Sequence, residues 1–322
     1  MTTTDASGGN RAPAVKHGVP LVASLMALGA GLVWSFGGLT AKLAKHADAW
    51  QYLVWRSIGV IVVMELVSRR RHTGFLIGRA FGEGPRMVLA CLSLLLASVA
   101  YVYALKNTSA ANAALLASIT PLIAAVIARV FLHERLTVIT VAAIGVAFVG
   151  LLVMVNAGAA SGTTSSSTAG NIAAMVSSLG FASYGACVRS MPERDWSPVM
   201  PGYAIIAVVA CGTVALVEGR PFMPPLHDAA LALFHGGAFI VIGTTLFNRA
   251  SRTVPAVAMT IFAQTETVFV PLWVFIGIGE RPRAGTLVGG AIILFAVVTK
   301  AVLDAARGTG RPSPGTVAPG PA

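Results

Sequence analysis

Ten stretches of mostly apolar residues run through this chain, each about as long as a helix that crosses a membrane. They lie at 21–43, 50–68, 87–105, 109–132, 136–156, 171–188, 198–217, 229–247, 254–278 and 284–303. Only 11% of the 322 residues are charged, whereas soluble domains carry roughly a quarter. The sequence therefore predicts an all-α membrane protein of ten transmembrane helices, and it excludes a soluble domain.

The distribution of basic residues among the loops predicts the orientation of these helices. Most Lys and Arg residues lie in alternate loops and in the two ends of the chain, as at Arg69–Arg71, Arg79 and Arg86. Because positive residues favour the cytoplasmic side, both termini should be cytoplasmic and the protein should lie in the cytoplasmic (inner) membrane. The net charge of +11 is then a signal of topology and of contact with anionic membrane lipids, not of nucleic-acid binding.

The two ends of the chain differ in composition from the apolar stretches. Residues 1–20 are polar and show no cleavage signal, so we expect a cytoplasmic tail followed by a first helix that stays as an anchor. Residues 304–322 are rich in Gly and Pro, which predicts a disordered cytoplasmic tail.

The second half of the sequence echoes the first. Residues 104–135 align with 250–281 without a gap, and both segments end in Glu-Arg. Each is the fourth apolar stretch of a set of five, and an odd number of helices forces the second set to enter the membrane upside down. Inverted repeats of this kind place a substrate site near the midplane between the halves. We therefore predict two five-helix repeats, at 21–156 and 171–303, joined by an extracytoplasmic linker at 157–170.

The segment YALKNTSAANAALLASITPLIAAVIARVFLHERLT, from Tyr103 to Thr137, resembles the closing part of an EamA repeat of the drug/metabolite transporter (DMT) superfamily. The second copy, from Val254 to Arg283, has VPAVAMT at its start and GERP at its end. The resemblance covers about residues 21–303. It implies ten helices around a central cavity that opens alternately to each side. It also implies a permease for a small metabolite, often one that exports amino acids or related compounds.

Glu266 is the strongest candidate for a functional residue, because it lies near the middle of the stretch 254–278. An acidic side chain there costs about 2.5–3.5 kcal/mol on insertion scales, and such residues face the protein interior or a wet cavity. Gln264 adds polarity beside it. The carboxyl group could bind a substrate amine or carry a proton, which would couple transport to a proton gradient. A neutral acid hydrogen-bonded between helices is the structural alternative.

Four further residues complete the predicted cavity. Arg56 lies inside the second stretch, where it either lines the cavity or extends its charged head toward the membrane surface. Trp34, Tyr101 and Tyr184 could form aromatic walls, although aromatic side chains also serve in packing and at interfaces. The candidate substrate site is therefore Trp34, Arg56, Tyr101, Tyr184, Gln264 and Glu266.

Two prolines lie inside apolar stretches, Pro121 in the fourth and Pro271 in the ninth. A proline removes a backbone donor and frees the carbonyl four residues earlier, here at Ala117 and Thr267. We predict a helix break near each proline, with a packing kink as the alternative. In related repeats a proline directly follows the glutamate, whereas this chain has Thr267 there, so the position of the second break is open.

No sequence motif indicates an enzyme. The chain has no Gly-rich phosphate loop, no HExxH metal motif and no GxSxG nucleophile elbow. Its three cysteines show no paired spacing, so we predict no metal and no cofactor. An intramembrane enzyme and a non-transporting scaffold remain the alternatives to a transporter of a small-molecule substrate. Either a monomer or a homodimer fits the sequence.

Overall fold

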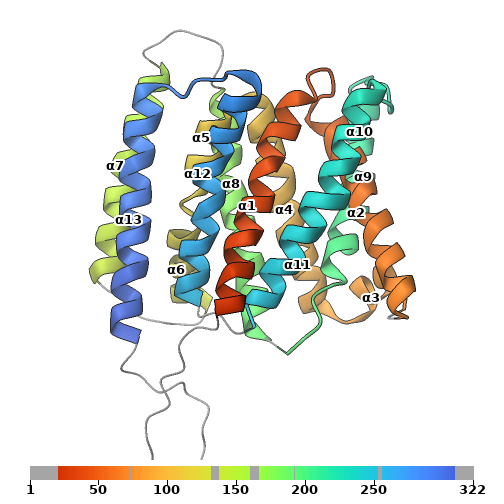
Figure 1. The fold of residues 1–322 in the computed structure, drawn as a ribbon, viewed down its shortest axis with the longest axis horizontal. Helices are drawn as coiled ribbons and strands as arrows, with labels where there is room; N and C mark the ends of the chain where they lie inside the picture. The colour runs from red at the N-terminus through yellow and green to blue at the C-terminus, as the bar shows by residue number, and fades with distance from the viewer. Residues whose placement is uncertain are drawn as a thin grey trace, which may run out of the picture.

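The computed structural model describes residues 21–72, 74–131, 138–159, 167–191, 193–252 and 256–308. These residues fold into a bundle of helices that run roughly side by side (Figure 1). In chain order the helices are α1 (Leu21–Leu43), α2 (Ala49–Arg71), α3 (Leu76–Gly82), α4 (Pro85–Asn107), α5 (Ala110–Ala117), α6 (Thr120–Phe131), α7 (Val138–Ala159), α8 (Thr168–Ser190), α9 (Val199–Val217), α10 (Leu226–Phe234), the π-helix η1 (His235–Ile240), α11 (Val241–Ala250), α12 (Ala256–Ile278) and α13 (Ala284–Gly308).

Length and composition make this a multi-pass membrane protein. Seven helical segments of the described residues are long and apolar enough to cross a membrane. Three shorter apolar segments lie within α7, α12 and α13, at Val141–Val153, Thr265–Ile278 and Ala284–Thr299. The all-α prediction is confirmed, whereas the number of ten spans stays a prediction. The sequence did not predict the short helix α3, which lies between two spans.

Local chemistry explains where several helices begin and end. Asp48 caps α2, because its carboxylate accepts a hydrogen bond from the backbone N–H of Gln51 at 2.8 Å, and the Gln51 side chain accepts one from the Asp48 N–H at 3.2 Å. Ser109 and Ser167 cap α5 and α8 in the same manner with their hydroxyl groups. Helix α2 ends at His72, which adopts the left-handed conformation.

The two halves pack with an approximate two-fold relation. Helix α1 packs against α11 and α12, and its counterpart α8 packs against α4, α5 and α6, the corresponding helices of the other half. The pairs α2–α9 and α7–α13 each join a helix to its own counterpart.

The halves also run in opposite directions. The C-terminal ends of α1 and α4 lie together, because the Lys42 ammonium donates to the Thr108 carbonyl at 2.7 Å. The N-terminal end of α8 lies at the same place, because the Ser167 N–H donates to the Asn107 carbonyl at 3.2 Å. Helix α8 therefore runs antiparallel to α1, as an inverted repeat requires.

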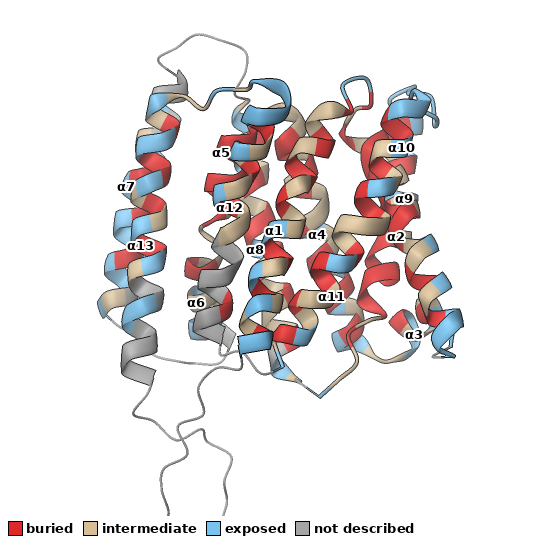
Figure 2. Ribbon diagram, in the orientation of Figure 1, coloured by how far each residue is buried: buried red, intermediate tan, exposed pale blue. Residues whose placement is uncertain are grey.

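Burial follows the pattern expected of a bundle in lipid. Buried residues gather on the helix faces that meet one another, and exposed residues lie on the outer faces, most visibly on α7 and α13 (Figure 2). Many exposed side chains are large and apolar, such as Val141 (56% exposed) and Phe295 (68%). Lipid tails are as apolar as these side chains, so their exposure has no hydrophobic cost in a membrane.

Candidate functional site

A cavity of about 210 Å³ lies between the two halves of the bundle. Its walls come from helices of both halves and are mainly apolar, with many small residues and five Trp, Tyr or Phe rings. The polar or ionisable members that matter for its chemistry are Arg56, Ser98, Tyr101, Tyr203, His235 and Glu266. An apolar concave site with a few convergent polar groups is typical of small-molecule binding.

Arg56 places a guanidinium group in this cavity from the second turn of α2. The residue is only 3% exposed, so its side chain does not extend to the membrane surface. Its Nη2 donates a hydrogen bond to the Ser98 hydroxyl of α4, and its Nε has no hydrogen-bond partner. Of the two interpretations that the sequence left open for Arg56, the structure places it in the cavity wall.

Glycines let the π-helix η1 approach α2 at Arg56. A methyl group on Gly236 would overlap the Arg56 carbonyl oxygen and lie 2.8 Å from its carbonyl carbon. A methyl group on Gly59 would likewise overlap the Leu233 carbonyl oxygen. The two backbones are therefore in direct contact, and this contact holds α2 and η1 at one spacing. Insertions of π-helix are often found at functional sites.

His235, the first residue of η1, is buried and also lines the cavity. The Tyr52 hydroxyl donates to Thr40 Oγ1 at 3.1 Å, and the Thr40 hydroxyl donates to the Gly37 carbonyl at 3.0 Å. The remaining contact, 2.8 Å between His235 Nδ1 and the Tyr52 oxygen, then has the imidazole as its donor. The donor chain thus places a proton on Nδ1 of His235.

Glu266 lines the cavity from α12, where the Tyr101 hydroxyl of α4 donates a hydrogen bond to its carboxyl group. Thr267 lines the cavity beside it. Glu266 takes part in no ion pair among the described residues. The structure therefore brings Glu266 and Tyr101 together. The side chain of Gln264 lies outside the described residues.

Aromatic rings form one wall of the cavity. Trp34 contacts Phe181 with ring centroids 5.6 Å apart and Phe247 at 5.4 Å. Tyr184 is not among the lining residues. It is fully buried behind this wall, where its ring packs on Phe247 and its hydroxyl donates to Asn248 Oδ1 at 2.7 Å. Contrary to the prediction, the structure places Tyr184 outside the cavity wall. Phe181 and Phe247 do line the cavity and were not predicted from the sequence.

The two prolines behave differently. The helix is interrupted between α5 and α6, and Pro121 follows the interruption in the first turn of α6. The Ala117 carbonyl accepts hydrogen bonds from the Thr120 hydroxyl at 2.8 Å and from the Ser178 hydroxyl at 3.0 Å. Pro271 lies inside α12, which continues through it as one helix, so the break predicted there is not observed.

A polar network closes one end of the bundle, at residues 43–49, 107–110, 217–226 and 278–284. We call it the opposite end, because it lies opposite the end that carries most of the arginines. Lys42 pairs with Glu280 at 3.4 Å. Lys106 donates to the Ala47 carbonyl at 2.8 Å, and Asp228 accepts from the Ala47 N–H at 2.8 Å. The network joins the first half to the second. None of the described cavity-lining residues comes from these four segments.

The other end carries the basic residues 69–71, 79, 194, 249 and 252, and we call it the arginine end. Three cavity-lining residues lie near it, Val188 and Ser251 at the ends of α8 and α11 and Met259 in the first turn of α12. The cavity therefore extends from the centre of the bundle toward the arginine end.

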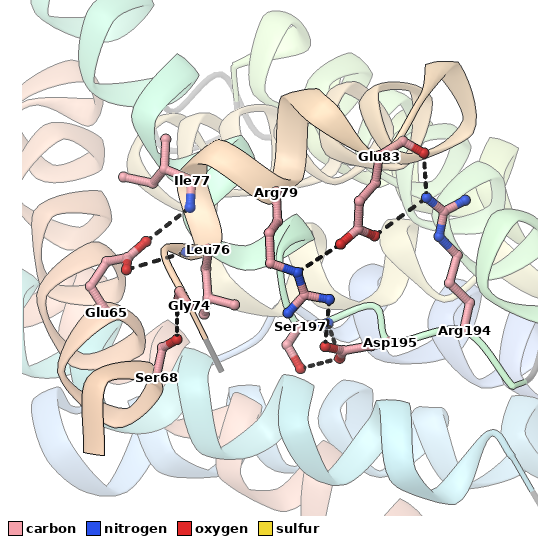
Figure 3. Close-up of polar contacts among 10 residues, drawn as sticks. All are labelled: Glu65, Ser68, Gly74, Leu76, Ile77, Arg79, Glu83, Arg194, Asp195 and Ser197. Carbon is pink, nitrogen blue, oxygen red and sulfur yellow. Dashed lines mark hydrogen bonds and ion pairs between the residues drawn. The ribbon is translucent and has the colours of Figure 1, made fainter. Parts of the chain in front are cut away.

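An ion-pair cluster at the arginine end joins α3 to the segment between α8 and α9 (Figure 3). Arg79 lies between two carboxylates, with Nε 2.7 Å from Glu83 and Nη2 3.1 Å from Asp195. Arg194 pairs with Glu83 at 3.4 Å. Burial opposes the charge on Asp195, but hydrogen bonds from Ser197 and Arg79 outweigh it and lower the pKa of Asp195 below its ordinary value.

The described residues contain no group of three or more His, Cys, Asp or Glu side chains that could hold a metal ion. Cys91, Cys187 and Cys211 are free thiols.

The chain is similar to known transporters over most of its length. The sequence model of the EamA-like transporter family matches residues 21–156 and 168–299. A protein described as "Uncharacterized transporter YyaM" from Bacillus subtilis (strain 168) is 23% identical in an alignment 281 residues long, and the match covers 82% of this chain and 89% of that protein. A solved structure described only as "Crystal structure of protein" superposes with a TM-score of 0.64 and 18% identity. The match covers 88% of this chain and 99% of that one, and shows a shared fold.

Proposed function

The chain belongs to the EamA-like transporter family, and on this basis we propose that it is a secondary transporter that moves a small metabolite across the cytoplasmic membrane by alternating access. The observation that carries the proposal is the cavity between the two halves, in which the guanidinium group of Arg56 and the carboxyl group of Glu266 are set among mainly apolar walls. Charged side chains inside a membrane protein mark substrate and ion pathways.

The arrangement of the two ends supports a carrier rather than an open pore. The opposite end is closed by ion pairs and hydrogen bonds between the halves, while the cavity extends toward the arginine end. The two halves are related by an approximate two-fold axis. If each half adopted the conformation of the other, the opposite end would open and the arginine end would close. The Lys42–Glu280 pair would then break as the cluster around Arg79 repacks.

The direction that we propose is export. The positive residues at the arginine end favour the cytoplasmic side, which also places both termini there. A cavity that extends toward the cytoplasm would load its cargo from inside the cell. The cargo is a small metabolite such as an amino acid or a related compound, because a volume of about 210 Å³ lies below the roughly 300–1,000 Å³ of pockets for larger ligands.

Glu266 is the group that we assign to proton coupling. Its only described hydrogen-bond partner is the neutral Tyr101 hydroxyl, so a proton can bind to the carboxyl group without breaking an ion pair. Binding and release of that proton on the two sides of the membrane would link cargo movement to the proton gradient.

Two measurements test the proposed transport. Metabolites inside and outside cells with and without the protein are compared first, and a compound that moves outward only with the protein is then tested with purified protein in liposomes. We expect the compound to cross unchanged and to respond to an imposed proton gradient. Chemical conversion of the compound would indicate an enzyme. A correctly inserted protein that moves no compound would contradict the proposal.

A further inference from the structure

The positive charge of Arg56 has no counter-charge in the described part of the molecule. The residue is 3% exposed and takes part in no ion pair among the described residues. The carboxyl groups of Glu266 and Asp228 have other partners. Glu266 is hydrogen-bonded to Tyr101, and Asp228 accepts the backbone N–H groups of His46 and Ala47. A buried charge without a partner is strongly unfavourable, so this position needs an anion for part of the transport cycle.

The donors of Arg56 are arranged so that an anion can bind. Nη2 donates to the Ser98 hydroxyl, which fixes the plane of the guanidinium group, while Nε is buried without a partner. A guanidinium group presents donors in a rigid fork that matches the two oxygens of a carboxylate. An exposed arginine would satisfy Nε with water. Here the side chain lines the cavity instead.

The surroundings of Arg56 restrict what kind of anion fits. Arg56 is the only Lys or Arg among the described residues that line the cavity, so the cavity offers one permanent positive charge rather than a pair for a divalent anion. The aromatic wall of Trp34, Phe181 and Phe247 lines the same cavity and offers apolar contact. A cargo that satisfies both features carries one carboxylate and an apolar body.

We infer that Arg56 is the anion-binding subsite of the cavity and that the cargo is a small organic carboxylate with an apolar body. This inference rests on the proposed transport function, since it names the class of cargo for the same cavity. Its carboxylate would accept hydrogen bonds from Nε and Nη of Arg56, while its body packs on the ring of Trp34. Glu266, which lines the cavity from α12, stays available for a proton.

The test measures binding rather than transport and starts with the unaltered protein. Thermal unfolding in detergent is followed with a thiol-reactive dye, because the buried thiols of Cys91 and Cys211 become reactive when the fold opens. The probes are 3-phenylpropanoate, its neutral amide and 3-phenylpropylamine, with chloride and inorganic phosphate as purely inorganic anions. A ligand that binds the folded state raises the unfolding temperature, and at one ligand concentration the rise is larger for the ligand that binds more tightly.

We expect 3-phenylpropanoate to stabilise the protein more than its amide, its amine or either inorganic anion. In Arg56→Gln the carboxylate should bind about 30-fold more weakly or worse, while binding of the amide changes little. Arg56→Lys keeps the charge but loses the fork, so it should fall between the two. The matched control is Arg129→Gln, which removes an arginine from the exposed face of α6 and should retain the full preference for the carboxylate.

Several outcomes would overturn the inference. One is that 3-phenylpropanoate raises the unfolding temperature of the parent protein no more than its amide does, or that no probe raises it at all. Others are an Arg56→Gln variant that keeps the preference, stronger stabilisation by the amine, and stabilisation by inorganic anions alone.

The proposed transport function can fail independently of the anion-binding subsite. If carboxylate binding depends on Arg56 but liposomes show no movement of solute, the subsite stands and transport falls. If Arg56→Gln transports an organic carboxylate as well as the parent protein does, transport stands and the subsite falls.

Discussion

Replacing Gly236 by alanine should destabilise the fold more than the same change at any other helical glycine that the structure describes. The added methyl group would overlap the Arg56 carbonyl oxygen and lie 2.8 Å from its carbonyl carbon, whereas ordinary contacts are 3.4–4 Å. Helices α2 and η1 must therefore separate by roughly 1 Å. Overpacking typically costs about 1–3 kcal/mol, and the upper end applies because a backbone carbonyl cannot rotate away. For a chain of this size roughly 2 °C corresponds to each kcal/mol, so we expect a loss of ~5 °C or more.

The matched control is Gly145 of α7, which faces outward and has no atom within 4 Å of an added methyl group. Gly145→Ala should leave the unfolding temperature unchanged or raise it slightly, because alanine favours a helix by about 1 kcal/mol over glycine. Both variants are measured in detergent with the thiol-reactive dye. Equal unfolding temperatures for the two variants would show that α2 and η1 do not meet backbone to backbone, and the assigned position of Arg56 would then be wrong.

Three further predictions concern coupling, topology and the ion-pair cluster. Glu266→Gln should insert and fold, because a neutral amide enters a membrane more easily than a carboxylate, but gradient-driven transport should fall strongly and lose its pH dependence. Normal transport with an unchanged pH profile would make Glu266 structural. Cysteines introduced within 157–168 should react with impermeant reagents from outside the cell and those within 69–86 from inside, and reaction of both from one side would refute the inverted topology. The pKa of Asp195 is lower in the folded protein than in the unfolded chain, so its stabilising contribution is complete above about pH 4 and is lost as the pH falls through the folded pKa. The gap in unfolding temperature between the parent protein and Asp195→Asn should thus be constant from about pH 8 to pH 5 and close below about pH 4. A gap that instead closes near neutral pH would assign the effect to another group.

The general fold and family could be predicted because a membrane imposes strong constraints on sequence. Helices must satisfy every backbone group within the bilayer, so long apolar stretches predict them reliably. The echo between 104–135 and 250–281 also pointed to two opposed halves, and the observed packing pairs each half with the other. The π-helix at His235–Ile240 was beyond this reasoning, because a π-helix leaves the apolar composition of its segment unchanged.

The ionisable members of the cavity could be predicted for a related reason. Burying a charge in a membrane helix is costly, so Glu266 and Arg56 stand out against an apolar background. Their partners do not stand out. Ser98 and Tyr203 resemble many residues that pack between helices, and only the approach of α4 and α9 to Arg56 brings them to the cavity. Their roles depend on distances between helices, which a single sequence does not provide.

The misplacement of Tyr184 shows that position in the internal repeat predicts which residues line the cavity better than aromatic character does. Trp34-Ser35-Phe36-Gly37 aligns with Ala182-Ser183-Tyr184-Gly185, so Tyr184 corresponds to Phe36 and not to Trp34. Residues three apart share a helix face, whereas residues two apart do not. Trp34 and Gly37 line the cavity, as do their counterparts Ala182 and Gly185, while neither Phe36 nor Tyr184 does. The aromatic character of Tyr184 suggested a binding wall, but its position in the repeat placed it behind that wall, where Asn248 binds its hydroxyl. In an inverted repeat the face of a residue is thus better predicted from its counterpart in the other half than from its side-chain type.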